Sequence, residues 1–289
     1  MYNLKNCNFI ILLPLYNDWE NLKILIKKIK KIKFNENFNY KILVIDDCSK
    51  TKSKKKIQSK NIKILRLYKN FGSQRAIAIG LKYIFRNFTK DYKFTIIMDS
   101  DGQDDPKILK KMIQLFNLNE DEAVVVQRTN RKEQLWFRIL YKVYKIIFLM
   151  FVCKQIKFGN FSLINNKYLF KVIDSNDLWA AYPATIIKNF KKIKKINYER
   201  LKRYKGITKM NLIKLFDHAL RVFSVFKTKI LFISLLYLII LLNIFGTMQI
   251  LIISIFFVLN LCLYIRYFIN SKNLEKNSTK IKKILNTIS

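Results

Sequence analysis

The sequence predicts an α/β domain, with a mostly parallel sheet between layers of helices, followed by a hairpin of two membrane-spanning helices. Three observations predict this fold. Short apolar runs alternate with helical patterns over the first half of the chain, several of these runs end in carboxylates, and a long apolar stretch lies near the end. The 289 residues are enough for one sizeable domain and an appendage.

The alternation of elements gives the predicted sheet its direction. Apolar runs predict strands over residues 9–13, 41–45, 62–67, 94–98 and 123–127. Apolar residues at helical spacing predict helices over residues 19–32, 74–85 and 107–115. Strands that alternate with helices pair in parallel, because each helix crosses over a face of the sheet.

The strand predicted over 94–98 stops in a cluster of carboxylates that includes Asp99, Asp101, Asp104 and Asp105. In open α/β sheets, ligands bind in the crevice outside the carboxyl ends of the strands. Asp99 and Asp101 therefore predict a site for a divalent cation together with substrate phosphates, since Mg²⁺ favours one or two carboxylates plus phosphate oxygens. The alternative is an acidic turn before a helix capped near Asp104.

A membrane hairpin is predicted near the end of the chain. From residue 230 to 268, Arg266 is the only charged side chain, and the run is interrupted near residues 243–249. Two spans of roughly 17 to 20 residues fit a bilayer core. Lysines and Arg266 flank the hairpin while its turn carries no charge, so both flanks are expected on the cytoplasmic side of the inner membrane. No signal peptide is expected, because the first apolar run has only the length of a strand.

Composition excludes several classes of protein. The net charge is +36, but lysine greatly outnumbers arginine and is spread over the whole chain, which argues against a nucleic-acid-binding surface and leaves a general attraction to anionic lipids and substrates. The four cysteines show no paired spacing, so neither a zinc site nor a disulfide framework is expected. His218 is the only histidine, and it fits a helix face better than a nucleophilic mechanism.

Four motifs in order resemble those of inverting GT-A glycosyltransferases of family 2. They are Pro14-Leu15-Tyr16-Asn17-Asp18, Val44-Ile45-Asp46-Asp47-Cys48-Ser49, Lys69-Asn70-Phe71-Gly72 and Met98-Asp99-Ser100-Asp101-Gly102-Gln103-Asp104-Asp105-Pro106. More narrowly, the chain resembles the polyprenyl-phosphate branch, which includes dolichol-phosphate mannosyltransferase and undecaprenyl-phosphate glucosyltransferases. The resemblance implies a nucleotide-sugar donor, a polyprenyl-phosphate acceptor, and Mg²⁺ or Mn²⁺.

The resemblance also implies roles for individual residues. The donor would be held by Pro14, Tyr16, Asp18, Asp47, Gly72 and Asp99, and the metal by Asp101 and Gln103. Tyr16 has an alternative as a core aromatic residue, and Gly72 as part of an ordinary turn before a helix. Bound metal would neutralise the departing diphosphate.

Basic residues after the acidic cluster predict a site for an anionic acceptor. Catalytic roles beside Asp101 are expected for Arg128, Arg131 and Arg138. The resemblance implies the same for Lys209, for which an ordinary surface lysine is the alternative. Arg138, Lys142 and Lys145 lie on one face of a predicted helix whose other face is apolar and aromatic, which indicates a helix in the membrane interface. A second, weaker amphipathic helix carries Lys214, Asp217 and Arg221. The alternative is that both helices pack on the sheet.

The expected divisions of the chain are a catalytic domain over 1–210 with an interfacial helix at 132–152, a juxtamembrane helix at 211–228, the hairpin at 229–269 and a basic cytoplasmic tail at 270–289. Self-association is a further possibility, and neither the sugar nor the nucleotide base is predicted.

One departure from the family bears on catalysis. Members of this branch commonly carry Gly-Asp-Phe-Arg where this chain has Gly159-Asn160-Phe161-Ser162. Asn160 cannot accept a proton, but a phosphate acceptor is already ionised and needs no dedicated base. Activity is therefore expected, with Asn160→Asp as its test. The departure leaves two alternatives open: a transferase with a hydroxyl acceptor in lipid-linked glycan or polysaccharide synthesis, and a non-catalytic membrane scaffold.

Overall fold

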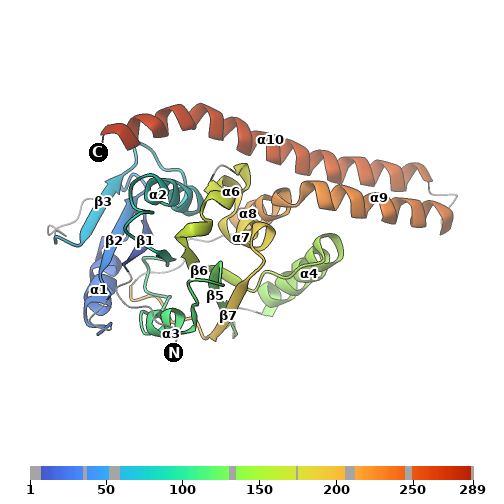
Figure 1. Ribbon diagram of the computed structural model, residues 1–289. Coiled ribbons are helices and arrows are strands. Elements are labelled where there is room, and N and C mark those ends of the chain that lie inside the picture. The colour runs from blue at the N-terminus through green and yellow to red at the C-terminus, as the bar shows by residue number, and fades with distance from the viewer. Residues whose placement is uncertain are drawn as a thin grey trace.

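The computed structural model consists of an α/β domain and a pair of long helices that project from it (Figure 1). It describes residues 8–34, 38–51, 59–129, 135–173, 175–205, 212–244 and 249–287, of which 135–138, 214 and 271–287 are described by their backbone only. The strands are β1 Phe9–Leu15, β2 Tyr40–Asp46, β3 Ile62–Arg66, β4 Phe94–Ile97, β5 Ala123–Arg128, β6 Phe158–Asn165 and β7 Ile193–Tyr198. The helices are α1 Trp19–Lys30, α2 Ser73–Asn87, α3 Ile108–Leu115, α4 Leu135–Val152, α5 Phe170–Ile173, α6 Asn176–Ala180, α7 Tyr182–Asn189, α8 Leu212–Val225, α9 Lys227–Ile244 and α10 Gln249–Thr287.

The predicted α/β fold is confirmed, with a sheet that is mixed and mostly parallel. The seven strands lie in the order β3-β2-β1-β4-β6-β5-β7. Strand β6 is antiparallel to both of its neighbours, β4 and β5, while the remaining pairs are parallel. The carboxyl ends of β1, β2, β4, β5 and β7 therefore meet along one edge, which is where ligands bind in such sheets.

Burial of the central strands on both faces holds the sheet between its helices. In β1, Ile10 and Leu12 join a core cluster with α2 and α5–α7, whereas Phe9, Ile11 and Leu13 join the opposite cluster with α1 and α3. Such strands read as continuous apolar runs, which explains why the sequence predicts them well.

Two strands were not predicted from the sequence. In β6, Asn160 and Ser162 interrupt the apolar pattern, although both side chains are buried. Strand β7 lies at the edge of the sheet and carries Lys194 and Lys195, in keeping with the charged residues that protect edge strands. In both cases tertiary placement, rather than the local apolar pattern, makes the segment a strand.

Helices α9 and α10 form the projecting hairpin. The segments Lys227–Ile244 and Gln249–Asn270 are long and apolar enough to cross a membrane, by length and composition alone, and most of their residues are exposed. The two helices are joined by a hydrogen bond between Asn260 Nδ2 and Ser234 Oγ (3.1 Å). Near the domain, Ile230 packs in a cluster with Phe148 of α4 and Phe226, and Tyr237 donates a hydrogen bond to the carbonyl of Met150 (3.2 Å).

The predicted tail at 270–289 continues α10 as helix to Thr287. His218 lies on α8, as expected. Cys48, Cys153 and Cys262 are free, and Cys7 lies outside the described residues. Both predicted amphipathic segments are helices, and each exposes apolar side chains: Ile139, Val143 and Ile146 on α4, and Ile213 and Phe216 on α8. Their place in a membrane interface stays a prediction.

Close packing of α2 on the sheet gives the first testable prediction. A Cβ added at Gly80 would lie 2.5 Å from the Leu12 side chain and 3.1 Å from that of Ile45, both buried. Gly80→Val should therefore lower the free energy of unfolding by about 2 kcal/mol through overpacking. Unfolding of the detergent-solubilised protein in denaturant measures this. Arg86→Val, on the exposed end of the same helix, is the control for β-branching, and equal losses in the two variants would contradict the packing argument.

Candidate active site

The carboxylates after β4 form a compact loop, residues 98–105, called the acidic loop below. Its backbone is folded around its own side chains: the Asp99 amide donates to the Asp104 carboxylate (2.8 Å) and the Gln103 amide donates to Asp101 Oδ1 (3.0 Å). Asp104 is almost completely buried, so it shapes the loop. Asp99 and Asp101 keep side-chain exposures of 21% and 17% and remain accessible to a ligand.

The segment after β7, residues 199–205, lies over the acidic loop and is called the covering loop. The Gln103 carbonyl accepts hydrogen bonds from the Tyr198 hydroxyl and the Leu201 amide, both at 3.0 Å. The ring of Tyr204 lies against Gly102, and the Tyr204 amide donates to the Asp101 carbonyl (3.4 Å). The two loops are thereby held together by both backbone and side chains.

The covering loop brings two arginines to the carboxylates. Arg200 lies 3.6 Å from Asp99. Arg203 lies 4.0 Å from Asp101 and forms an ion pair with Asp18, which follows β1. Sequence reasoning missed both arginines. The available signal was a charged run directly after a strand, but that strand, β7, was not predicted.

Burial and mutual repulsion make the acidic loop hard to ionise. Burial first, and then the neighbouring charge of Asp99, raises the pKa of Asp101, while Arg200 and Arg203 lower it. Burial and Asp99 raise the pKa of Asp104 to about 7, against the opposing effects of a backbone hydrogen bond and nearby arginines, including Arg128. A site with such a surplus of carboxylates favours the binding of a cation.

The donor set of the acidic loop fits a hard divalent cation that shares its coordination with substrate phosphates. Asp99 and Asp101 supply carboxylate oxygens, the ligand type that Mg²⁺ and Mn²⁺ prefer. The Gln103 amide nitrogen donates to the Leu201 carbonyl (3.5 Å), so this side chain is engaged with the covering loop. Within the described residues, no group of three or more His, Cys, Asp or Glu side chains could hold a metal.

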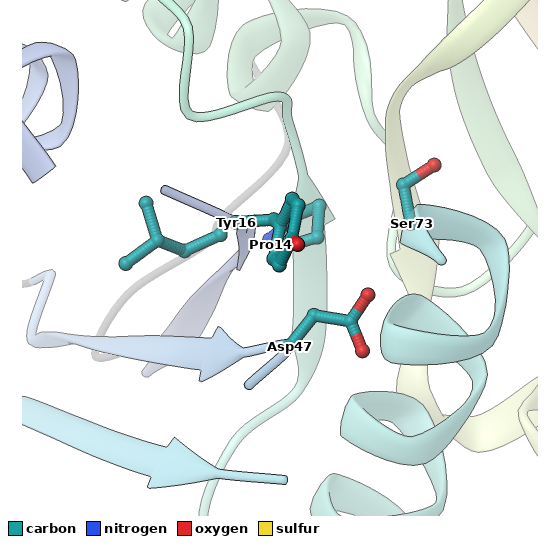
Figure 2. Close-up of a pocket in the computed structure, with 5 residues that line it drawn as sticks. Pro14, Tyr16, Asp47 and Ser73 are labelled. Atoms are coloured by element: carbon teal, nitrogen blue, oxygen red, sulfur yellow. The ribbon is translucent and has the colours of Figure 1, made fainter. Parts of the chain in front are cut away.

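A pocket at the same edge of the sheet is lined by three of the predicted donor residues. Pro14, Tyr16 and Asp47 line it together with Leu15 and Ser73, and Figure 2 shows the Asp47 carboxylate between the end of β1 and the start of α2. Gly72, another predicted residue, directly precedes Ser73 in the chain. The Tyr16 side chain is 40% exposed, so its core alternative is wrong and an aromatic face is available to a ligand.

Asp47 fixes the start of α2. One carboxylate oxygen accepts the Phe71 amide and the other accepts the Gly72 amide, each at 2.7 Å. Gly72 has a φ of +90°, with nothing within 4 Å of an added Cβ, so the backbone conformation rather than close approach explains this glycine. Burial raises the pKa of Asp47 to about 6, despite these hydrogen bonds.

Asn160 connects the acidic loop to α2. Its amide nitrogen donates to Asp99 Oδ1 (2.9 Å), and its oxygen accepts from the Gln74 amide (2.9 Å). Gln74 in turn accepts the backbone amide of Tyr182 (2.8 Å). Ser162, the other departure from the family pattern, is fully buried and hydrogen-bonded to the Tyr182 hydroxyl. An amide suits residue 160 because it donates to a carboxylate and accepts from Gln74 at once.

The predicted basic residues are placed unevenly. The guanidinium of Arg128 lies against Gly159, 2.6 Å from the position that a Cβ would take there, and its charge acts on Asp104. Arg138 lies in α4, where only the backbone is described. Arg131 and Lys209 lie outside the described residues. Of these four residues, Arg128 is the one whose side chain the structure describes near the acidic loop.

Comparison of the sequence with models of protein families identifies the family of this chain. A model described as glycosyl transferase family 2 matches residues 10–182, more than half of the chain. The chain belongs to this family. Among curated relatives, an uncharacterized glycosyltransferase of Synechocystis is 26% identical over 230 residues, which are 73% of this chain and 66% of that protein.

Two further relatives have assigned activities in their names. The dolichol-phosphate mannosyltransferase of Pyrococcus furiosus is 29% identical over 118 residues, 39% of this chain and 31% of that protein. The dodecaprenyl-phosphate galacturonate synthase of Rhizobium johnstonii is 23% identical over 134 residues, 44% of this chain and 38% of that protein. The chain thus spans two thirds or less of the length of each of these relatives.

Solved structures show the GT-A fold. Glucosyl-3-phosphoglycerate synthase from Mycobacterium tuberculosis, in complex with Mn²⁺ and UDP-glucose, is 12% identical and superposes with a TM-score of 0.54 over 77% of this chain and 79% of that chain. TarS from S. aureus, in complex with UDP-GlcNAc, is 15% identical with a TM-score of 0.50 over 78% of this chain and 66% of that chain. Both neighbours were solved with nucleotide sugars, and the first also with Mn²⁺.

The Asn160 network gives a prediction for stability and its pH dependence. In Asn160→Asp, the hydrogen bond to Asp99 is replaced by two carboxylates in contact, which should cost about 1–3 kcal/mol of unfolding free energy at pH 7.5. Repulsion raises the pKa of the pair in the folded state above its unfolded value, so the variant loses stability relative to wild type as the pH rises through that raised pKa and regains it at lower pH.

Unfolding of the detergent-solubilised variant across pH 4.5 to 8 measures this effect. Asn160→Ala is the control, because it removes the same hydrogen bonds without adding a charge, and its loss should not vary with pH in this manner. A pH-independent difference between Asn160→Asp and wild type would contradict the contact between Asn160 and Asp99.

Proposed function

We propose that this protein is a membrane-anchored, inverting glycosyltransferase that moves a sugar from a UDP- or GDP-sugar onto a polyprenyl phosphate, with Mg²⁺ or Mn²⁺ as cofactor. The observation that carries the proposal is the acidic loop at the carboxyl edge of the sheet, where Asp99 and Asp101 stay accessible beside the pocket of Pro14, Tyr16 and Asp47. Nothing in folding requires two half-buried carboxylates there, because their burial costs free energy.

The donor would lie across the pocket and the acidic loop. The base and ribose would contact Tyr16 and Asp47, and the diphosphate would reach Asp99 and Asp101, which would hold the cation. Bound Mg²⁺ or Mn²⁺ supplies electrostatic stabilisation of the departing diphosphate. Arg200, Arg203 and Arg128 add positive charge around the same phosphates.

Asn160 favours a phosphate over a hydroxyl as the acceptor. Its amide is committed to Asp99 and Gln74, and an amide takes no proton at neutral pH. A hydroxyl acceptor needs a general base within reach, whereas a phosphate monoester is already ionised near pH 7. The relatives named for dolichol-phosphate and dodecaprenyl-phosphate substrates support the same choice.

The hairpin supports an acceptor that resides in the membrane. Helices α9 and α10 have the length and composition of membrane spans, and α8 and α4 carry exposed apolar side chains next to them. A bilayer around α9 and α10 would place these surfaces at its interface. The flanking lysines then indicate an inner-membrane protein whose catalytic domain faces the cytoplasm.

Product formation tests the proposal. The purified full-length protein is incubated in detergent with UDP- and GDP-sugars, undecaprenyl phosphate, and Mg²⁺ or Mn²⁺, and lipid products are identified by mass spectrometry. One donor should yield a glycosyl-phosphoryl lipid, and Asp101→Ala should lower its rate by about 100-fold or more, because the leaving diphosphate loses its counter-charge. Chelation of divalent cations should have the same effect on the wild type.

Asp91→Ala is the matched control, since it removes an exposed aspartate on the opposite edge of the sheet, before β4. Its rate should equal that of the wild type. Transfer to a lipid-linked hydroxyl instead of a phosphate would refute the acceptor, and the absence of any metal-dependent donor binding would refute the enzyme in favour of a membrane scaffold.

A further inference from the structure

Three arginines from distant parts of the chain meet where the hairpin joins the domain. Arg75 comes from α2, Arg221 from α8 and Arg266 from α10. Asp217 of α8 forms ion pairs with both Arg221 (2.5 Å) and Arg266. The charges of Arg221 and Arg266 also act on Arg75. These three side chains are called the arginine cluster below.

Among the described residues, the arginine cluster carries more positive charge than the carboxylates paired with it neutralise. Asp217 is one carboxylate against three guanidinium groups, and among the described residues Arg75 has no carboxylate within ion-pair distance. The Nε atoms of all three arginines are buried without a hydrogen-bond partner. Burial, followed by repulsion from Arg221 and Arg266, lowers the pKa of Arg75. Like charges gathered this closely are unfavourable unless an anion binds among them.

Packing alone does not explain Arg75. It lies in the first turn of α2, with its guanidinium 5.4 Å from the centre of the Trp179 ring. Its neighbours on the helix, Gln74 and Ala76, are buried, and an uncharged residue at 75 would avoid the repulsion from α8 and α10. Guanidinium groups are well suited to phosphate, because each presents a planar fork of donors that binds two oxygens.

The arginine cluster lies between the donor pocket and the proposed membrane. On one side, the field of Asp47 acts on Arg75, and Trp179 packs against both Arg75 and Phe71, whose amide is bound by Asp47. On the other side, Arg266 is the one charged residue in the apolar run from 230 to 268. A phosphate attached to a lipid tail would reach this position from the bilayer.

We propose that Arg75, Arg221 and Arg266 bind the phosphate group of a membrane lipid and hold it beside the donor pocket. The proposal rests on the function proposed above, in which that lipid is the acceptor, and adds the residues that capture it. Asp217 has a positioning role: it holds Arg221 and Arg266 while leaving Arg75 to the ligand. This binding site is separate from Arg128 and the acidic loop.

Equilibrium binding of a labelled polyprenyl phosphate to the full-length protein in detergent tests the inference. Arg75→Gln should weaken binding by about tenfold, as expected for loss of a charge-assisted hydrogen bond to phosphate. The affinity of Arg75→Lys, which keeps the charge but not the planar guanidinium group, should lie between that of Arg75→Gln and that of the wild type. Arg86→Gln removes the same charge from the exposed end of α2 and should bind as the wild type does.

Thermal unfolding separates this loss from misfolding. Because Arg75 is repelled by its neighbours, Arg75→Gln should be at least as stable as the wild type in the absence of lipid, and only the wild type should gain stability when the lipid phosphate is added. The inference would be overturned if Arg75→Gln bound the lipid phosphate as tightly as Arg86→Gln does. It would also be overturned if the weaker binding of Arg75→Gln came with a lower unfolding temperature in the absence of lipid.

Competing ligands identify what the arginine cluster binds. Displacement by inorganic phosphate or phosphatidylglycerol, with the same dependence on Arg75, supports a general phosphate site, and displacement by the polyprenyl phosphate alone supports the acceptor. Equal displacement by polyprenol would overturn the inference, because the chain and not the phosphate would be recognised. The product assay distinguishes failure of the proposed function from failure of this inference. If no product forms but lipid-phosphate binding depends on Arg75, the proposed function fails and the arginine cluster is still supported as a binding site. If a product forms but binding does not depend on Arg75, the inference fails and the proposed function stands.

Discussion

The cost of holding carboxylates at a half-buried sheet edge governs the arrangement of this site. Asp99, Asp101 and Asp104 crowd into one loop, and burial raises the pKa of Asp101 and Asp104. The chain offsets this cost with two kinds of partner: backbone amides of the loop itself and arginines brought by the covering loop. Residues 199–205 pack over the acidic loop and bring these arginines to it, so the β7 edge of the sheet is part of the site.

Polar contacts of the same kind join the acidic loop to the pocket of Pro14, Tyr16 and Asp47. Arg203 pairs with Asp18 after β1 as well as lying near Asp101, and Asn160 joins Asp99 to Gln74 at the start of α2. Asp47 holds the amides just before that helix. The ends of β1, β2, β4, β6 and β7 are thus connected through polar contacts.

The sequence allowed prediction of the parts whose signal is local. Strands β1, β2, β4 and β5 are buried on both faces and read as apolar runs, and the acidic motif marks the carboxyl end of β4. Arg200, Arg203 and β7 were missed because their role depends on a pairing between β5 and β7 that are far apart in the chain. The paired role of Asp217 and Arg221 was missed for a similar reason: a helical face predicts a polar surface but not that α10 supplies its partner, Arg266.

Arg266 links α10 to α8 at the base of the hairpin. A charged side chain within an apolar helix is costly in a bilayer unless it is paired or reaches the interface. Its ion pair with Asp217 would meet that need and joins α10 to α8, while Asn260 and Ser234 join α9 to α10 within the hairpin. The ion pair therefore fixes Arg266 within the arginine cluster, beside the contacts that Ile230 and Tyr237 make with the domain. In the proposed function, a lipid phosphate held there would meet the pocket of Pro14, Tyr16 and Asp47 at a fixed distance from the membrane, so that the hairpin would position the acceptor as well as the enzyme.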